Sequence, residues 1–332
     1  MYKIYMFSLR EDEKPYLNQI KEKYPHFDIT TTSDGLTIDN IDLVKGFDAI
    51  TVSQAKHLTE DIYKKLSEYN IKIIGCRSAG FDPYHVDIAR KYNIPFSNVP
   101  VYSPNSVAEF VVLTTLIMTR KFMKVRENVQ NQDFRWNPDL ISPELRFMTV
   151  GIIGTGNIGR NAARLFKGMG ANVIGYDLYP NDLAKEYLTY ENSIEELLKK
   201  SDIISLHMPL TNDNKYLINK DTISLMKDGA FIVNAGRGGL VNTKDLIEAL
   251  DSEKIAGAAI DTYENEDIYF RFDWSNKQIE DETLKTLINH KKVVLTPHTA
   301  FYTTESIKNL TQTPFDIFNE YLTTNKSDYI VN

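Results

Sequence analysis

Four side chains that could bind and protonate a small carboxylic acid follow short apolar runs in the second half of the chain. They are Arg237, Asp261, Glu266 and His298. A histidine titrates near neutral pH and can give a proton to a carbonyl oxygen, and a neighbouring carboxylate stabilises its charged form. An arginine can bind a substrate carboxylate with its planar fork of N–H groups. This combination predicts exchange of a hydride and a proton between a nicotinamide and a 2-oxo acid.

A glycine-rich segment predicts where the nicotinamide nucleotide binds. It lies between a strand-like run and an amphipathic one, and it consists of Gly154, Thr155, Gly156, Asn157, Ile158 and Gly159. Gly154 allows a tight turn, Gly156 lets the backbone approach a pyrophosphate, and Gly159 lets helix and strand pack closely. The N–H groups at the start of the helix then face the phosphates.

The kind of dinucleotide is indicated by Asp177, which ends the next strand-like run, 172–176. A carboxylate at this place accepts hydrogen bonds from the ribose hydroxyls of the adenosine. The same negative charge repels a 2′-phosphate. The sequence therefore predicts NAD rather than NADP.

Apolar and amphipathic segments that could position these residues alternate along nearly the whole chain. In the first hundred residues, strands are predicted at 2–7, 27–30, 47–52, 71–75 and 94–98, and helices at 11–23, 60–69 and 84–92. Around and after the glycine-rich segment, strands are predicted at 149–153, 172–176, 202–207, 230–234, 256–260 and 292–296, and helices at 160–169, 193–200, 221–227 and 243–249. This order predicts an α/β fold with two doubly wound parallel sheets, in which ligands bind at the carboxyl ends of the strands.

Two further helices suggest how the chain divides into domains. One is predicted to begin at 103–106, with Pro104 in its first turn and a capping box at Ser106 and Glu109, and to continue to about Gln130. It would link the domains, or it would form a subunit interface. The last helix, 304–321, exceeds what the nucleotide domain needs, so we expect it to return to the first domain. The predicted division is 1–101 plus 299–332 for the substrate domain and 102–298 for the NAD-binding domain.

Composition limits the possible partners and locations. The 332 residues are 42% hydrophobic and carry a formal net charge of −7, which argues against nucleic acid or an anionic membrane as a partner. The first residues lack a signal-peptide pattern, so we expect a cytoplasmic protein. Cys76, the one cysteine, is expected to be a buried structural thiol. No His/Cys cluster has metal-ligand spacing, so no metal is predicted, and His26, His57, His85 and His290 are interpreted as structural or surface residues.

The chain resembles the D-2-hydroxyacid dehydrogenases. The resemblance covers nearly the whole chain and is carried by VGIIGTGNIGR, ISLHMPLT, VNAGRGGLVNT, GAAIDTYENE, LTPHTAFYT and, at the domain junction, SNVPVYSPNSVAEF. It implies a Rossmann NAD-binding domain inserted into a flavodoxin-like substrate domain, and a homodimer.

The resemblance also implies a role for each residue of the site. Arg237 would bind substrate, His298 would be the acid/base and Glu266 its partner, because the family's spacing between arginine and acid selects Glu266 rather than Glu264. Asp261 would hold the nicotinamide carboxamide. The remaining implied contacts are His207 and Pro209 for the cofactor, and Tyr102 with the backbone of Ala79 and Gly80 for the substrate carboxylate.

The insertion DIYFRFDWSN resembles the branch of the family that interconverts D-lactate and pyruvate, so this reaction is expected. Aromatic residues near the site predict a pocket narrow enough to prefer the methyl group of pyruvate; they are Tyr102, Phe301, Tyr302, Tyr269, Phe270, Phe272 and Trp274. A larger substrate, 2-oxoisocaproate or 2-oxoglutarate, is the alternative within the family. A non-catalytic NAD-sensing protein is the alternative outside it, and the intact Arg237, Glu266 and His298 set argues against that.

Overall fold

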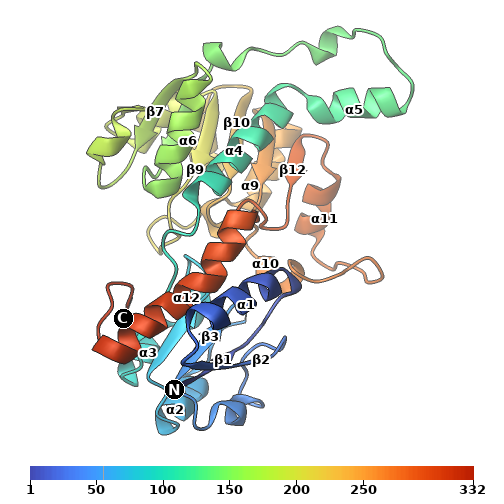
Figure 1. Cartoon of the computed structure of the whole chain (residues 1–332). Helices are drawn as coiled ribbons and strands as arrows, with labels where there is room; N and C mark the ends of the chain where they lie inside the picture. Colours follow the sequence, from blue (N-terminus) through green and yellow to red (C-terminus); the bar gives the residue numbers. More distant parts are fainter. Residues whose placement is uncertain (55) are drawn as a thin grey trace. The chain divides into compact units, whose positions relative to one another are not determined.

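The computed structural model describes residues 1–54 and 56–332, which form two compact units. The first unit comprises Met1–Ser103 and Tyr302–Asn332, and the second comprises Pro104–Phe301 (Figure 1). Both units contain a parallel sheet, so the predicted α/β class is confirmed. Within the described residues, every helix is too short or too polar to cross a membrane.

The first unit has a five-stranded sheet in the order β2-β1-β3-β4-β5. Its strands are β1 (Tyr2–Met6), β2 (Phe27–Thr31), β3 (Ala49–Val52), β4 (Ile73–Cys76) and β5 (Phe96–Ser97). Its helices are α1 (Lys14–Lys23), α2 (Glu60–Glu68), α3 (Val86–Lys91) and α12 (Thr304–Thr324). This strand order is that of flavodoxin-like folds, and it places the carboxyl ends of all five strands at one edge.

Alternation along β1 explains why helices cover both faces of this sheet. Ile4 and Met6 point into a core shared with α1 and α12, whereas Tyr5 and Phe7 point into a core shared with α2 and α3. Close packing of α12 is possible because β4 carries Gly75, where a Cβ atom would lie 2.9 Å from the ring of Phe318. The last residues then run beside β5, where the Val331 N–H donates to the Phe96 carbonyl at 2.8 Å.

The second unit has a seven-stranded sheet in the order β12-β11-β10-β9-β6-β7-β8. Its strands are β6 (Thr149–Ile153), β7 (Asn172–Tyr176), β8 (Thr189–Tyr190), β9 (Ile203–Leu206), β10 (Ala230–Asn234), β11 (Ile255–Ile260) and β12 (Val293–Leu295). Its helices are α4 (Pro104–Thr119), α5 (Phe122–Gln130), α6 (Asn157–Gly168), α7 (Ile194–Lys200), α8 (Lys220–Leu225), α9 (Thr243–Asp251), α10 (Glu266–Tyr269) and α11 (Glu282–Asn289). Helices α4 and α6 share one core with the sheet, and α7, α8 and α9 share the other.

The predicted single helix from 103 to Gln130 is wrong, because the structure divides it into α4 and α5. Lys121 adopts a left-handed backbone with φ of +51°, which ends the helical path. Helix α4 buries one side against the sheet, whereas α5 has no buried residue and so loses the packing that kept α4 in place. The predicted capping box is also wrong, because Ser106 is the third residue of α4 and is itself buried.

Two neighbouring side chains of the first unit, Cys76 and Arg77, are buried. Cys76 is buried as predicted, and burial raises the pKa of its thiol to about 11. The next residue, Arg77, forms a buried ion pair with Glu13 at 2.8 Å, and its guanidinium also donates to the carbonyls of Phe7 and Ser8. The ion pair therefore joins β4 to the segments that follow β1.

Glu13→Gln should strongly destabilise the first unit, because it leaves the Arg77 charge buried without its carboxylate. Breaking such a pair costs about 3–5 kcal/mol of unfolding free energy. Urea unfolding followed by circular dichroism measures the loss. The matched control is Glu68→Gln, which removes an exposed pair with Lys65 and should leave unfolding unchanged. Equal urea midpoints for the two variants would contradict this account.

Candidate active site

The glycine turn after β6 has the shape that a dinucleotide requires. Gly154 has φ of +89°, and a Cβ atom there would lie 2.8 Å from the backbone of His207. A Cβ on Gly159 would lie 1.9 Å from the Gly154 carbonyl oxygen, so helix and turn pack at backbone contact. A Cβ on Gly156, by contrast, would have no neighbouring atom within 4 Å. A pyrophosphate can therefore approach the backbone at the start of α6.

Asp177 lies against this turn. One carboxylate oxygen accepts the backbone N–H of Thr155 at 2.6 Å and its hydroxyl at 3.1 Å, and the other accepts the N–H of Tyr179 at 2.9 Å. The carboxylate is thus held beside the glycine segment, where the ribose of an adenosine would lie.

The strand order changes direction at β6, because β7 pairs with one side of it and β9 with the other. Ligands bind at such a point in open α/β sheets. His207 follows β9 there, and burial lowers the pKa of its ring to about 4, so the imidazole is neutral. Its Nε2 contacts the Ser205 hydroxyl at 2.8 Å, while its buried Nδ1 has no hydrogen-bond partner among the described residues. Pro209, two residues on, accepts a hydrogen bond from Asn214 through its carbonyl.

His298 and Glu266 form the acid–base pair. The imidazole Nδ1 lies 2.7 Å from one Glu266 oxygen, and the other oxygen accepts the Tyr263 N–H at 3.0 Å. Burial raises the pKa of Glu266, but the hydrogen bond and charge of His298, the Tyr263 N–H and the Arg237 guanidinium outweigh it. The net effect is a pKa below the ordinary value, so Glu266 is a carboxylate at neutral pH.

The other acid of the YENE motif, Glu264, contacts a different residue. Glu264 accepts a hydrogen bond from the Tyr216 hydroxyl at 2.6 Å. Arg237 lies in the turn after β10, where the Asn234 amide donates to its carbonyl at 2.8 Å. The structure therefore brings His298 and Glu266 together, with the Arg237 charge close enough to lower the pKa of Glu266.

Asp261 holds the turn that carries His298. Its carboxylate accepts the Thr296 hydroxyl at 2.6 Å and the N–H groups of Thr299 at 2.9 Å and Ala300 at 3.0 Å. Its carbonyl accepts the His298 N–H at 2.7 Å, and His298 itself has φ of +55°. Both carboxylate oxygens are thus engaged inside the loop, so a nicotinamide carboxamide at Asp261 would be an additional partner.

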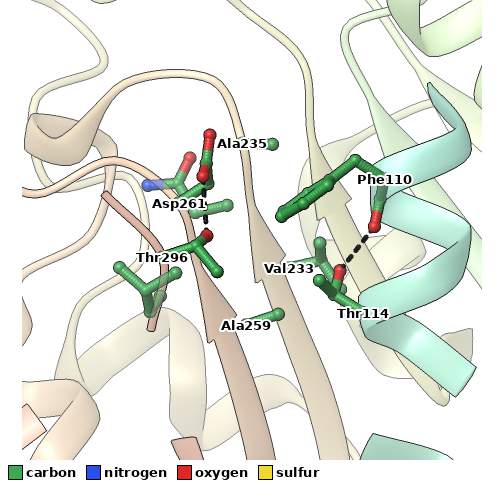
Figure 2. A pocket seen from close by; sticks show the side chains of 9 residues that line it. Phe110, Thr114, Val233, Ala235, Ala259, Asp261 and Thr296 are labelled. Atoms are coloured by element: carbon green, nitrogen blue, oxygen red, sulfur yellow. Dashed lines mark hydrogen bonds between the residues drawn. The ribbon is translucent and has the colours of Figure 1, made fainter. Parts of the chain in front are cut away.

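A small hollow lies beside these residues, lined by side chains of α4 and of the strand ends (Figure 2). Figure 2 shows the ring of Phe110 and the side chain of Thr114, both on α4, near Ala235, Asp261 and Thr296 at the strand ends. The sequence does not reveal Phe110 and Thr114 as site residues, because apolar and small residues on a buried helix look like ordinary core.

The remaining predicted substrate contacts lie in the first unit. Ala79 and Gly80 form the turn after β4, where Asn98 donates to the Ala79 carbonyl and the Ser78 hydroxyl donates to the Gly80 carbonyl, both at 2.6 Å. Tyr102 follows β5, and its carbonyl accepts from Asn309.

The aromatic rings of the insertion have different surroundings in the structure, and Phe272 is exposed. Phe270 is buried in a small core with Tyr263 and two leucines of α11. Trp274 packs on Tyr269, with ring centroids 5.3 Å apart. Phe301 is the ring beside the acid–base pair, edge-on to His298 with centroids 6.2 Å apart.

The other histidines contact groups away from these residues. His57 and His85 face each other at 2.8 Å, His26 contacts Asn319, and His290 contacts Asp251. Across the described part of the chain, His, Cys, Asp and Glu form no group of three that could hold a metal ion.

Comparison with known proteins identifies the family. The family model "D-isomer specific 2-hydroxyacid dehydrogenase, NAD binding domain" matches residues 112–300. The chain is 44% identical over 305 residues to a D-lactate dehydrogenase of Treponema pallidum, covering 92% of each chain. It is 40% identical to a D-2-hydroxyacid dehydrogenase (NAD(+)) of Clostridioides difficile, covering 99% of this chain and 100% of the other. A solved D-2-hydroxyisocaproate dehydrogenase superposes with a TM-score of 0.91 at 34% identity, covering 99% of each chain. The chain therefore belongs to the D-isomer specific 2-hydroxyacid dehydrogenases and carries their NAD-binding domain.

Proposed function

We propose that this protein interconverts pyruvate and D-lactate with NADH and NAD. The observation that carries the proposal is the 2.7 Å hydrogen bond between His298 and Glu266, with the Arg237 charge nearby, in the unit that contains the glycine turn. The name of the Treponema pallidum relative supports the choice of substrate. When bound, NADH supplies the hydride that the carbonyl carbon accepts.

The residues of the chain handle the proton and the substrate carboxylate. Glu266 engages Nδ1 of His298, so Nε2 is the nitrogen that can give a proton to the carbonyl oxygen during reduction. We assign substrate binding to Arg237, and the negative charge of Glu266 stabilises the imidazolium. In the first unit we assign contacts with the substrate carboxylate to Tyr102 and to the N–H groups of Ala79 and Gly80.

The cofactor contacts are proposed on the same basis. Asp177 would accept from the adenosine ribose, and His207 and Pro209 would line the cofactor site at the end of β9. The unpartnered Nδ1 of His207 supports this assignment, since a bound group can complete its hydrogen bonding. Asp261 would hold the nicotinamide carboxamide.

The acid–base pair can be tested by two substitutions. His298→Gln should lower kcat for pyruvate reduction by about 10²–10⁴-fold while NADH binding, measured by fluorescence, stays unchanged. Glu266→Gln should be milder, because the imidazole stays in place and only the negative charge that stabilises the imidazolium is lost. His290→Gln is the control and should behave as wild type. Full activity in His298→Gln would remove this histidine from the mechanism.

A larger 2-oxo acid is the second candidate substrate. The fold similarity to a D-2-hydroxyisocaproate dehydrogenase favours this larger substrate. The packing of Phe270 and Trp274 within the insertion favours it too, because these two rings then do not narrow the substrate pocket. Phe301 beside His298 still favours the small substrate.

We expect kcat/KM for pyruvate to exceed that for 2-oxoisocaproate and 2-oxoglutarate by about 10²-fold, since each misfitting methylene costs about 1–3 kcal/mol. Phe301→Ala should lower the ratio of kcat/KM for pyruvate to kcat/KM for the larger acids. Phe272→Ala, which removes an exposed ring of the insertion, should leave this ratio unchanged. Steady-state rates with NADH on one preparation decide between the substrates. If 2-oxoisocaproate equals or surpasses pyruvate in wild type, the larger acid is the substrate.

We also propose that the protein is a cytoplasmic homodimer. Support for the dimer comes from a set of exposed apolar side chains on α5 and the segment after it, which lies away from the sheet of its own unit (Figure 1). This apolar arm consists of Phe122, Met123, Val129, Phe134, Trp136 and Ile141, and Trp136 is fully exposed. A patch of this kind is typical of a protein–protein interface.

Trp136→Lys should convert the dimer to monomer, because a charge replaces a large apolar ring at the proposed interface. Light scattering coupled to size-exclusion chromatography measures the mass over a range of concentrations. Phe272→Lys, at an exposed ring outside the arm, is the matched control and should remain dimeric. A dimeric Trp136→Lys variant, or a monomeric wild type, would refute the apolar arm as the dimer interface.

A further inference from the structure

We propose that Tyr190 is a positioning residue that makes the site select NADH over NADPH. It acts through Thr155 on Asp177, the carboxylate assigned to the adenosine ribose. The inference rests on the proposed use of NAD at this turn, and it adds a residue that lies outside the glycine motif.

The contacts form an unbroken path from Tyr190 to the carboxylate. The Tyr190 hydroxyl lies 2.6 Å from the Thr155 hydroxyl, which lies 3.1 Å from Asp177. On its other side the Tyr190 oxygen accepts the backbone N–H of Asn181 at 2.9 Å. Thr155 is fully buried, so its hydroxyl has no water to replace these partners.

The hydroxyl groups on this path can all donate toward the carboxylate. A carboxylate only accepts, so the Thr155 hydroxyl is the donor in its 3.1 Å contact with Asp177. The Thr155 oxygen can then accept the Tyr190 proton at 2.6 Å, in competition with the Asn181 carbonyl, which the Tyr190 hydroxyl also reaches at 3.4 Å, while the Tyr190 oxygen accepts the Asn181 N–H. Each hydrogen bond in such a chain polarises the next, and the chain ends on the negative charge.

This arrangement decides how freely the carboxylate can move. Backbone N–H groups of Thr155 and Tyr179 and the Thr155 hydroxyl together hold both Asp177 oxygens. A carboxylate fixed in this way opposes a 2′-phosphate with its full charge and presents its remaining lone pairs to a ribose diol. Without Tyr190, the Thr155 hydroxyl can rotate away, and the carboxylate is then held by the backbone N–H groups of Thr155 and Tyr179 alone.

The fold keeps Tyr190 in place. It lies on β8, which pairs with β7 at Gly175. A Cβ on Gly175 would lie 2.8 Å from the side chain of Leu188, so the strands and the segment before β8 pack closely. The ring therefore reaches the glycine turn from a strand on the edge of the sheet.

The test measures dissociation constants of NADH and NADPH by fluorescence titration of wild type and Tyr190→Phe. We expect NADH to bind the variant about 3- to 10-fold more weakly, the size of one lost hydrogen bond, while NADPH binding is unchanged or stronger. Thr155→Val should reduce the preference for NADH over NADPH in the same way. The double variant should lose no more of this preference than Thr155→Val alone, because both changes break one path. Tyr187→Phe is the matched control and should leave both constants unchanged.

Asp177→Ala separates failure of this inference from failure of the cofactor assignment. If Asp177→Ala leaves the preference for NADH intact, the assignment of this turn to the adenosine ribose is wrong. If Asp177→Ala narrows the preference and Tyr190→Phe does not, only the role of Tyr190 is wrong. A Tyr190→Phe variant that weakens both nucleotides equally, with a lower melting temperature, would show a purely structural tyrosine and would also overturn the inference.

Discussion

The carboxylate of Asp261 holds the turn on which the acid–base geometry of the second unit depends. His298 has a left-handed backbone, which persists in a non-glycine residue only where the surroundings impose it. Asp261 imposes it by accepting the N–H groups of His298, Thr299 and Ala300. With the turn fixed, the imidazole meets Glu266 through a defined nitrogen. A buried acid at one strand end therefore orients a histidine at the end of the next.

Most of the site could be predicted because parallel strands collect their carboxyl ends at one edge. Buried strands are visible as apolar runs, and β10, β11 and β12 are neighbours, so the polar residues that follow them must meet. The spacing of residues could not choose between Glu264 and Glu266 without the family resemblance. The choice depends on the short helix α10, whose first residue, Glu266, meets His298 while Glu264 meets Tyr216.

Other features leave no signal that sequence patterns can detect. The break at Lys121 has neither glycine nor proline, and it is set by the loss of packing after α4. Strand β8 has two residues, which is too short to show alternation, so Tyr190 could not be connected with the glycine turn. Phe110 has the composition of core and acquires its place at the hollow only through the packing of α4 on the sheet.

The division of the first unit between the two ends of the chain has a consequence for biosynthesis. One of its cores needs Phe315, Ile317 and Phe318 of α12 to cover Ile4 and Met6 of β1. The ribosome makes β1 before the second unit and α12 after it, so this face of the sheet stays uncovered while the whole second unit is translated. The second unit is continuous and can fold during that interval, since domains generally fold as they emerge. Nascent chains released before α12 would carry an exposed apolar sheet face and would be substrates for chaperones.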